Sequence, residues 1–167
     1  KNSVEVVIPI YNEETELAQS VQTLWKFLDK NLSIPWQITI VNNASTDRSP
    51  EIYQQLAREN RRVDFRRIEQ KGRGRMLKKI WLEVPFDIAL YMDLDLSTDL
   101  PHIRHCVDAI SQNGYDLAIG SRTKAGARVV GRSLKREITS RGYIYLVKLL
   151  TRSRLSDYQC GFKAISQ

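Results

Sequence analysis

Short hydrophobic runs alternate along the chain with segments in which hydrophobic residues recur every three or four positions. The runs are rich in β-branched residues and end at turn-forming residues, which is typical of buried strands. The expected strands cover residues 4–9, 36–41, 63–68, 88–93 and 117–120. The expected helices cover residues 15–30, 49–59, 76–83, 101–113 and 134–149. This alternation predicts an α/β fold, with a mostly parallel central sheet flanked by helices on both faces.

Polar turns follow three of the expected strands, at residues 11–14, 42–47 and 93–98. The carboxyl ends of parallel strands lie at one edge of the sheet, where ligands bind in folds of this kind. We therefore expect the three turns to meet there and form a site. After the second turn, Ser49 is followed by a proline and an acid, which predicts a helix start with Ser49 as the capping residue.

The third turn carries two aspartates, Asp93 and Asp95, at the end of a hydrophobic run. Side chains alternate along a strand, so both carboxylates are expected to point the same way. Neighbouring carboxylates repel each other unless water or a cation lies between them. Because Mg²⁺ is commonly held by one or two carboxylates together with substrate phosphates, the pair predicts a metal–diphosphate site. An acidic loop without a metal is the alternative.

The composition is that of a globular protein, with 42% hydrophobic and 27% charged residues. The 167 residues are expected to form one domain, residues 1–167, that is truncated at its C-terminus. No hydrophobic run approaches the roughly 20 residues that a membrane span needs. The two cysteines, Cys106 and Cys160, are too few for a disulfide framework. They indicate a reducing, cytoplasmic setting, and we expect both to be buried.

Positive charge is concentrated in the C-terminal third of the chain. Residues 121–154 contain ten lysines or arginines and one acid, whereas the whole chain has a net charge of +7. This part is therefore expected to bind an anionic partner, although a solvated helix face explains any single basic residue equally well. A nucleic-acid-binding module would also explain the charge, but it would leave the paired aspartates without a role.

Six motifs in the chain resemble those of the family-2 glycosyltransferases. They are VVIPIYNEE (6–14), VNNASTD (41–47), YMDLDLST (91–98), GSR (120–122), LKREITSRGY (134–143) and DYQCGFK (157–163). Within this family the chain is similar to the dolichyl-phosphate and polyprenyl-phosphate hexosyltransferases, which include glucose and mannose synthases. Its last motif is more similar to the glucosyl-transferring relatives. The resemblance implies a GT-A (Rossmann-like) fold, and transfer of a hexose with inversion at the sugar carbon.

The resemblance also implies a donor and a metal, namely UDP-glucose or GDP-mannose with Mg²⁺ or Mn²⁺. Asp93 and Asp95 fall on the donor and metal motif of the family, and Asp95 is an expected catalytic residue. The residues expected to contact the donor are Pro9, Tyr11, Asn12, Glu13, Asn43, Lys71, Arg75 and Asp93. Relatives often have two aspartates where this chain has Asn42 and Asn43, so two negative charges are missing from the nucleotide site.

A lipid phosphate at the cytoplasmic face of a membrane is the acceptor that the resemblance implies. The second pKa of a phosphate ester is about 6, so this acceptor is already an anion at neutral pH and needs cations rather than a general base. The residues expected to contact it are Arg122, Arg136, Ser140 and Arg141, and the first two are expected to be catalytic as well. A sugar or protein hydroxyl is the alternative acceptor. It would need a base, for which Asp157 is the candidate. The expected partners are thus the donor, the lipid phosphate and a membrane surface, and not a nucleic acid.

Overall fold

The computed structural model describes residues 2–68, 72–83, 85–121, 134–152, 155 and 157–167. Within these residues the strands are β1 (Val4–Ile10), β2 (Trp36–Asn42), β3 (Val63–Arg67), β4 (Ile88–Tyr91), β5 (Leu117–Ile119) and β6 (Lys163–Ser166). The helices are α1 (Leu17–Asn31), α2 (Ser49–Glu59), α3 (Arg73–Glu83), α4 (Pro101–Ser111) and α5 (Leu134–Thr151). The chain forms two compact units, which we describe separately. The first comprises Lys1–Ala118 with Phe162–Gln167, and the second comprises Ile119–Gly161.

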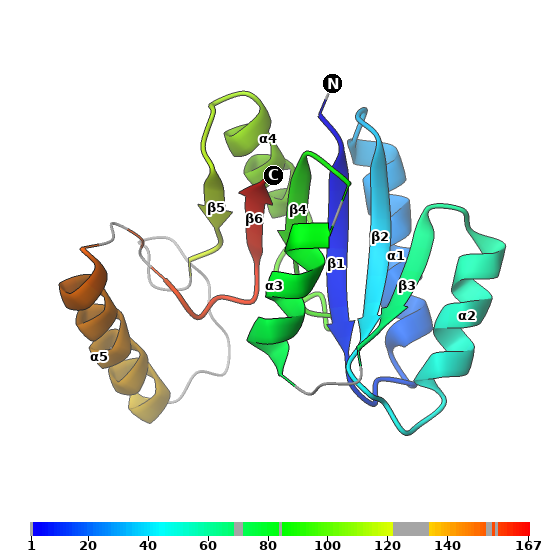
Figure 1. The fold of residues 1–167 in the computed structure, drawn as a ribbon, viewed down its shortest axis with the longest axis horizontal. Helices are drawn as coiled ribbons and strands as arrows, with labels where there is room; N and C mark the ends of the chain where they lie inside the picture. Colours follow the sequence, from blue (N-terminus) through cyan, green and yellow to red (C-terminus); the bar gives the residue numbers. More distant parts are fainter. Residues whose placement is uncertain (1, 69–71, 84, 122–133, 153–154, 156) are drawn as a thin grey trace. The chain divides into compact units, whose positions relative to one another are not determined.

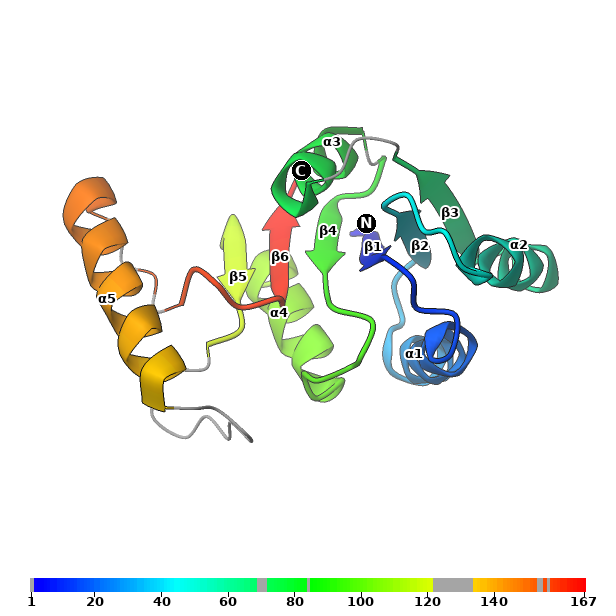
Figure 2. The same ribbon diagram turned by 90° about the horizontal axis from the view of Figure 1, so that it is seen from below.

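The strands form one sheet in the order β3-β2-β1-β4-β6-β5. β1 pairs in parallel with β2 and β4, and β2 pairs in parallel with β3. In the first unit, α3 covers one face of the sheet, while α1 and α4 cover the other (Figures 1 and 2). The expected α/β fold, with a mostly parallel sheet between helices, is therefore confirmed.

Alternate residues of β1 supply both hydrophobic layers of the first unit. On the α3 side, Val7 packs with Val41, Met76 and Ile80, all of which are buried. On the opposite side, α1 buries the face formed by Leu17, Val21, Leu24 and Leu28. These four positions recur at helical spacing, so burial of one side of α1 follows directly from the hydrophobic pattern.

Three features of the first unit differ from the expectation. β4 ends at Tyr91, two residues before the predicted end of that strand. α3 begins at Arg73 rather than at residue 76, so Gly74 lies inside the helix. A sixth strand, β6, pairs antiparallel with β4 and was not predicted. With only four residues, β6 is too short to show a hydrophobic period of its own.

The second unit contains α5 and the segment that leads to β6, and a side-chain hydrogen bond joins the two. The side chains of Ser140 and Ile144 are buried, and Ser140 Oγ donates a hydrogen bond to Gln159 Oε1 over 3.0 Å. Cys160 is buried in this unit and Cys106 in the first, as expected, and neither forms a disulfide. Among the helices within the described ranges, none combines the length and hydrophobicity needed to cross a bilayer. The expectation of a single domain stays a prediction.

Candidate functional site

Hydrogen bonds tie the turn after β1 to the turn after β2. The Asn12 N–H donates to Ser45 Oγ over 3.0 Å, and Asn12 Oδ1 accepts from the Thr46 N–H over 2.8 Å. The Asn43 N–H donates to the Ile10 carbonyl over 3.0 Å. Both turns follow the carboxyl ends of their strands, at the lower edge of the sheet in Figure 1. They are thus held against each other by side chains that reach the opposite backbone.

A second set of hydrogen bonds extends this connection to the start of α2. Asp47 accepts from the N–H groups of Glu14 and Ser49, each over 3.0 Å, and Glu14 Oε2 accepts from the Arg48 N–H over 2.8 Å. Ser49 Oγ accepts from the Glu13 N–H over 3.1 Å, and α2 has no side-chain cap. The expectation that Ser49 caps α2 is therefore wrong, because its hydroxyl holds the first turn instead.

The same hydrogen bonds change the acidity of Asp47. Partial burial acts to raise its pKa, but the hydrogen bonds from Ser49 and from the Glu14 N–H outweigh that effect and hold the pKa below its usual value. Asp47 therefore remains ionised under mildly acidic conditions, and its acceptor oxygens keep both turns in place.

Each of the three expected turns contains one residue with a left-handed backbone. The φ angles are 55° at Asn12, 62° at Ala44 and 48° at Leu96. This conformation is tolerated by asparagine, but it costs an alanine or leucine about 1–2 kcal/mol. Strain of this kind persists only where the surrounding contacts impose it, and it gathers at functional sites.

The third turn completes a cavity of about 270 Å³, which we call the acidic cavity. It is lined by Pro9, Glu13, Asp93, Leu94 and Asp95. Pro9 and Glu13 come from β1 and the turn after it, and the other three follow β4. Because the turn after β2 is bonded to the turn after β1, the prediction that all three turns meet at one edge is confirmed.

The two aspartates reach the acidic cavity for a different reason from the one expected. Since β4 ends at Tyr91, strand alternation does not place them. Instead, Asp93 Oδ1 accepts from the Tyr91 hydroxyl over 2.9 Å, and Asp95 Oδ1 accepts from the Ser97 N–H over 3.0 Å. These bonds orient each carboxylate from outside the cavity.

The acidic cavity fits a divalent cation that a second ligand helps to bind. Its carboxylate oxygens are hard donors of the type that Mg²⁺ and Mn²⁺ prefer. In the part of the chain that the structure describes, no three His, Cys, Asp or Glu side chains are grouped closely enough to hold a metal by themselves. Two carboxylates with the remaining positions filled by phosphate and water therefore suit this site better than a closed protein cage.

Two asparagines at the end of β2, Asn42 in the strand and Asn43 directly after it, have different environments. Asn42 is buried, and its Oδ1 accepts from the Ser45 N–H over 2.8 Å, so it supports the turn. Asn43 Oδ1 is buried without a hydrogen-bond partner among the described residues. An unpaired buried acceptor is costly, and a ligand N–H is one way to satisfy it. Tyr11, from the turn after β1, has 47% of its surface exposed and can stack against a flat ligand.

Arg75 and Lys71 are the two basic candidates for contact with the donor. Arg75 is exposed in the first turn of α3 and is not among the residues that line the acidic cavity. Lys71 lies outside the described residues. Their expected contacts with the donor stay predictions.

The acceptor candidates belong to the second unit. Asp157 is buried, and its Oδ1 accepts from the Gln159 N–H over 2.8 Å. Ser140 is buried on α5, whereas its neighbour Arg141 is exposed. Arg122 lies outside the described residues, and so does the side chain of Arg136, although its backbone is part of α5. The grouping of these residues around an acceptor phosphate stays a prediction.

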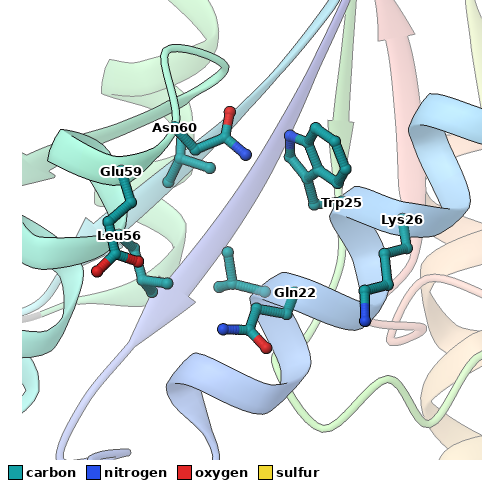
Figure 3. A pocket seen from close by; sticks show the side chains of 8 residues that line it. Gln22, Trp25, Lys26, Leu56, Glu59 and Asn60 are labelled. Atoms are coloured by element: carbon teal, nitrogen blue, oxygen red, sulfur yellow. The ribbon is translucent and has the colours of Figure 1, made fainter.

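A second cavity, of about 240 Å³, lies between α1 and α2 (Figure 3). Side chains from α1, including Trp25 and Lys26, face Leu56, Glu59 and Asn60 across it. Half of its eight lining residues are hydrophobic, and Glu59 is the one acidic residue among them. It therefore lacks the paired carboxylates that make the acidic cavity suitable for a metal-bound diphosphate.

The sequence matches the model of the family described as "Glycosyl transferase family 2" over residues 5–167. The chain belongs to glycosyltransferase family 2. The chain has a GT-A fold, as expected, since its structural neighbours have that fold. The glucosyl-3-phosphoglycerate synthase of Mycobacterium tuberculosis, solved with Mn²⁺ and UDP-glucose, matches 99% of this chain and 56% of its own with a TM-score of 0.69 and 16% identity.

Curated relatives of the chain are more similar in sequence. Glycosyltransferase AglD of Haloferax volcanii is 37% identical over 98% of this chain and 26% of its own length. The dolichol-phosphate mannosyltransferase of Pyrococcus furiosus is 31% identical over 97% of this chain and 46% of its own. The dolichyl-phosphate beta-glucosyltransferase of Saccharomyces cerevisiae is 26% identical over 98% of this chain and 54% of its own. The chain thus spans between a quarter and about half of these relatives.

Sequence reasoning missed the residues that join the turns. Ser45 and Asp47 are of residue types typical of turns, and Ser49 of a type typical of helix caps, yet all three accept hydrogen bonds from the turn after β1. The density of small polar residues after β2 was the available signal. It indicates that backbone N–H groups will be bonded there, but not which N–H groups.

Proposed function

We propose that this glycosyltransferase moves a hexose from a nucleotide-diphosphate sugar to a polyprenyl or dolichyl phosphate, with inversion and with a divalent metal. The observation that carries the proposal is the acidic cavity, in which Asp93 and Asp95 lie beside Glu13 at the end of the parallel strands. Relatives that are named for transfer to dolichyl phosphate support the acceptor class. The reaction would take place at the cytoplasmic face of a membrane.

The nucleotide would bind across the first two turns. The exposed ring of Tyr11 offers a stacking surface for the base, and Asn43 Oδ1 offers an acceptor for a ring N–H. Asn12 and Pro9 would shape the pocket around the ribose, because the hydrogen bonds of Asn12 fix this turn before any ligand arrives. Preorganised contacts of this kind reduce the entropy that binding must overcome.

The diphosphate would lie against the acidic cavity. Asp93 and Asp95 would hold Mg²⁺ or Mn²⁺ there, and such an ion supplies charge stabilisation for the departing diphosphate. Tyr91 and Ser97 orient the two carboxylates through the hydrogen bonds described above. Lys71 and Arg75 are proposed to neutralise part of the remaining phosphate charge.

The acceptor phosphate would be bound by Arg122, Arg136, Ser140 and Arg141. Arginine suits this role because its planar guanidinium binds two phosphate oxygens at once. The phosphate is itself the nucleophile, so no residue has to remove a proton from it. Within this scheme Asp157 is a supporting residue, and its hydrogen bond to the Gln159 N–H is consistent with that role.

Glucose is favoured over mannose as the transferred sugar, because the DYQCGFK motif is more similar to the glucosyl-transferring branch. A donor titration tests this choice. Calorimetry with UDP-glucose and GDP-mannose, each with and without Mn²⁺, should show metal-dependent binding, tighter for UDP-glucose. Binding of neither nucleotide sugar would contradict the proposal. Single-stranded DNA serves as a control, because salt-sensitive DNA binding without a metal requirement would favour the nucleic-acid alternative.

The acceptor class is tested by incubating the protein with the labelled donor and a short, water-soluble prenyl phosphate. Radioactivity in the prenyl phosphate fraction is the expected result. Transfer to free sugars or peptides in its place would favour the alternative acceptor, a hydroxyl group. In that case Asp157→Asn should abolish transfer, because a hydroxyl nucleophile needs a base.

A further inference from the structure

Helix α5 has one packed side, and that side is small. Ser140 and Ile144, one helical turn apart, are buried, and Ser140 is bonded to Gln159. Every other residue from Ile138 to Thr151 is exposed except the half-buried Val147, which continues the packed side. Most of the helix circumference therefore faces away from its own unit.

The exposed surface of α5 is mainly hydrophobic, and we call it the apolar arc. It consists of Ile138, Tyr143, Tyr145, Leu146, Leu149 and Leu150, all exposed, with Leu150 at 75%. At 3.6 residues per turn these positions cover about 160° of the helix. The two tyrosines occupy the two borders of the arc, where a ring can be half inserted while its hydroxyl stays in water.

A basic stripe borders the apolar arc on one side. Arg141 and Lys148 lie two helical turns apart on the same line of α5, and Arg152 follows at its C-terminal end. All three are exposed. Residues 138–152 include no acidic residue. The outer surface of α5 thus combines a wide hydrophobic strip with positive charge along one border.

We propose that this surface docks onto an anionic lipid bilayer, with the apolar arc inserted between lipids and the basic stripe against their phosphate groups. Helices with a broad hydrophobic face and basic residues beside it lie in the membrane interface in this way. A second copy of the chain fits less well, because it would bring a like-charged stripe against this one. The inference rests on the proposed lipid acceptor and adds to it the surface that brings the protein to that acceptor.

The test is sedimentation of the purified protein with vesicles of phosphatidylcholine alone or with phosphatidylglycerol added. We expect binding to the anionic vesicles only. A variant carrying Leu146→Gln, Leu149→Gln and Leu150→Gln should bind them at least about tenfold more weakly, since three hydrophobic side chains no longer enter the bilayer. Leu82→Gln on α3 is the matched control, because Leu82 is also 75% exposed, and it should bind like the unsubstituted protein.

The inference is overturned if the unsubstituted protein ignores anionic vesicles, or if the α5 variant and the Leu82→Gln control bind them equally. It is also overturned if the substitutions in α5 abolish a dimer, which would make the arc an interface between copies. Donor binding, measured by calorimetry, shows that each variant has folded. Vesicle binding without any transfer to a prenyl phosphate would instead contradict the proposed function and leave this inference standing.

Discussion

The acidic cavity of the first unit and the outer surface of α5 in the second are built in opposite ways. The cavity is concave and acidic, and side-chain hydrogen bonds tie the turns around it to one another. The surface of α5 is exposed, basic and hydrophobic, and one side-chain bond, from Ser140 to Gln159, is described on its packed side. A preorganised cavity suits a small polar ligand, whereas an exposed helix suits an extended partner. In the proposed function, the first unit would therefore bind the donor and the second unit would bind the acceptor.

Replacing Asp95 with asparagine should have the largest effect and should be confined to the donor side. Asn keeps an oxygen for the Ser97 N–H but removes the charge, so metal-dependent binding of UDP-glucose should weaken at least about 100-fold. Calorimetry with and without Mn²⁺ measures this change. Asp99→Asn, at an exposed aspartate four residues along, is the control and should bind normally. Unchanged metal dependence in Asp95→Asn would remove the acidic cavity from the proposed site.

Replacing Arg136 with alanine should affect only the acceptor side. Loss of a charge-assisted phosphate contact should raise the KM for the prenyl phosphate about tenfold, with donor affinity unchanged. Steady-state kinetics and calorimetry on the same preparation separate the two effects. Arg58→Ala, at an exposed arginine of α2, controls for the loss of one positive charge. An equal loss of donor and acceptor binding would break the comparison between the two regions.

Two substitutions at Asn12 test whether hydrogen bonds or backbone conformation hold the first two turns together. Asn12→Ala loses the acceptor for the Thr46 N–H and places alanine at a φ of 55°, which should lower the free energy of unfolding by about 1–2 kcal/mol. Asn12→Gly loses the same acceptor but adopts this φ without strain. Urea denaturation should therefore rank the glycine variant above the alanine variant. Identical stabilities would mean that the backbone strain is small.

Replacing Glu5 with glutamine should have the smallest effect and should raise stability. Glu5 is buried in β1, its Oε2 lacks a hydrogen-bond partner among the described residues, and burial raises its pKa. A carboxyl group whose pKa is raised in the folded state makes the fold less stable as the pH rises above the group's ordinary pKa of 4.5. Glu5→Gln should thus increase the free energy of unfolding by about 1 kcal/mol at pH 7, and by less at pH 4.

Asp47 also makes the stability of the fold depend on pH. Its lowered pKa acts in the opposite direction to the raised pKa of Glu5. The stability that Asp47 contributes is present above its ordinary pKa and is lost as the pH falls through the lowered value. It is common to the unsubstituted protein and Glu5→Gln, so it cancels when their urea midpoints are compared at each pH. If the stability advantage of Glu5→Gln over the unsubstituted protein grew toward acidic pH, the ionised Glu5 would be stabilising the fold.

Most of the first unit could be predicted because its pattern is strong. Burial on both faces makes β1 and β2 rich in β-branched residues, and one buried side makes α1 periodic. The meeting of the turns followed from the rule for parallel sheets. The strand β6 could not be predicted in the same way, because its antiparallel pairing with β4 depends on contacts that arise only in three dimensions.

The details of the site were less predictable than its location. Glycine disfavours a helix, yet α3 extends over Gly74, because Met76 and Ile80 pack on Val7. Tertiary packing outweighs the cost of about 1 kcal/mol for a glycine in a helix. The left-handed φ of Ala44 has no signal in its residue type, since glycine or asparagine would be expected there. The hydrogen bonds between the turns impose it.

The pairing order also bears on how such enzymes diversify. β5 and β6 are neighbours in the sheet, and the Ser166 N–H donates to the Asp116 carbonyl over 3.0 Å. The 119–161 segment is therefore an insertion whose two ends lead to neighbouring strands of the sheet. Each doubling of the length of such an insert adds only about 0.6 kcal/mol to the entropy cost of closing it. Recombination can thus exchange the whole segment, and with it the proposed acceptor site, while the scaffold of the first unit keeps its shape.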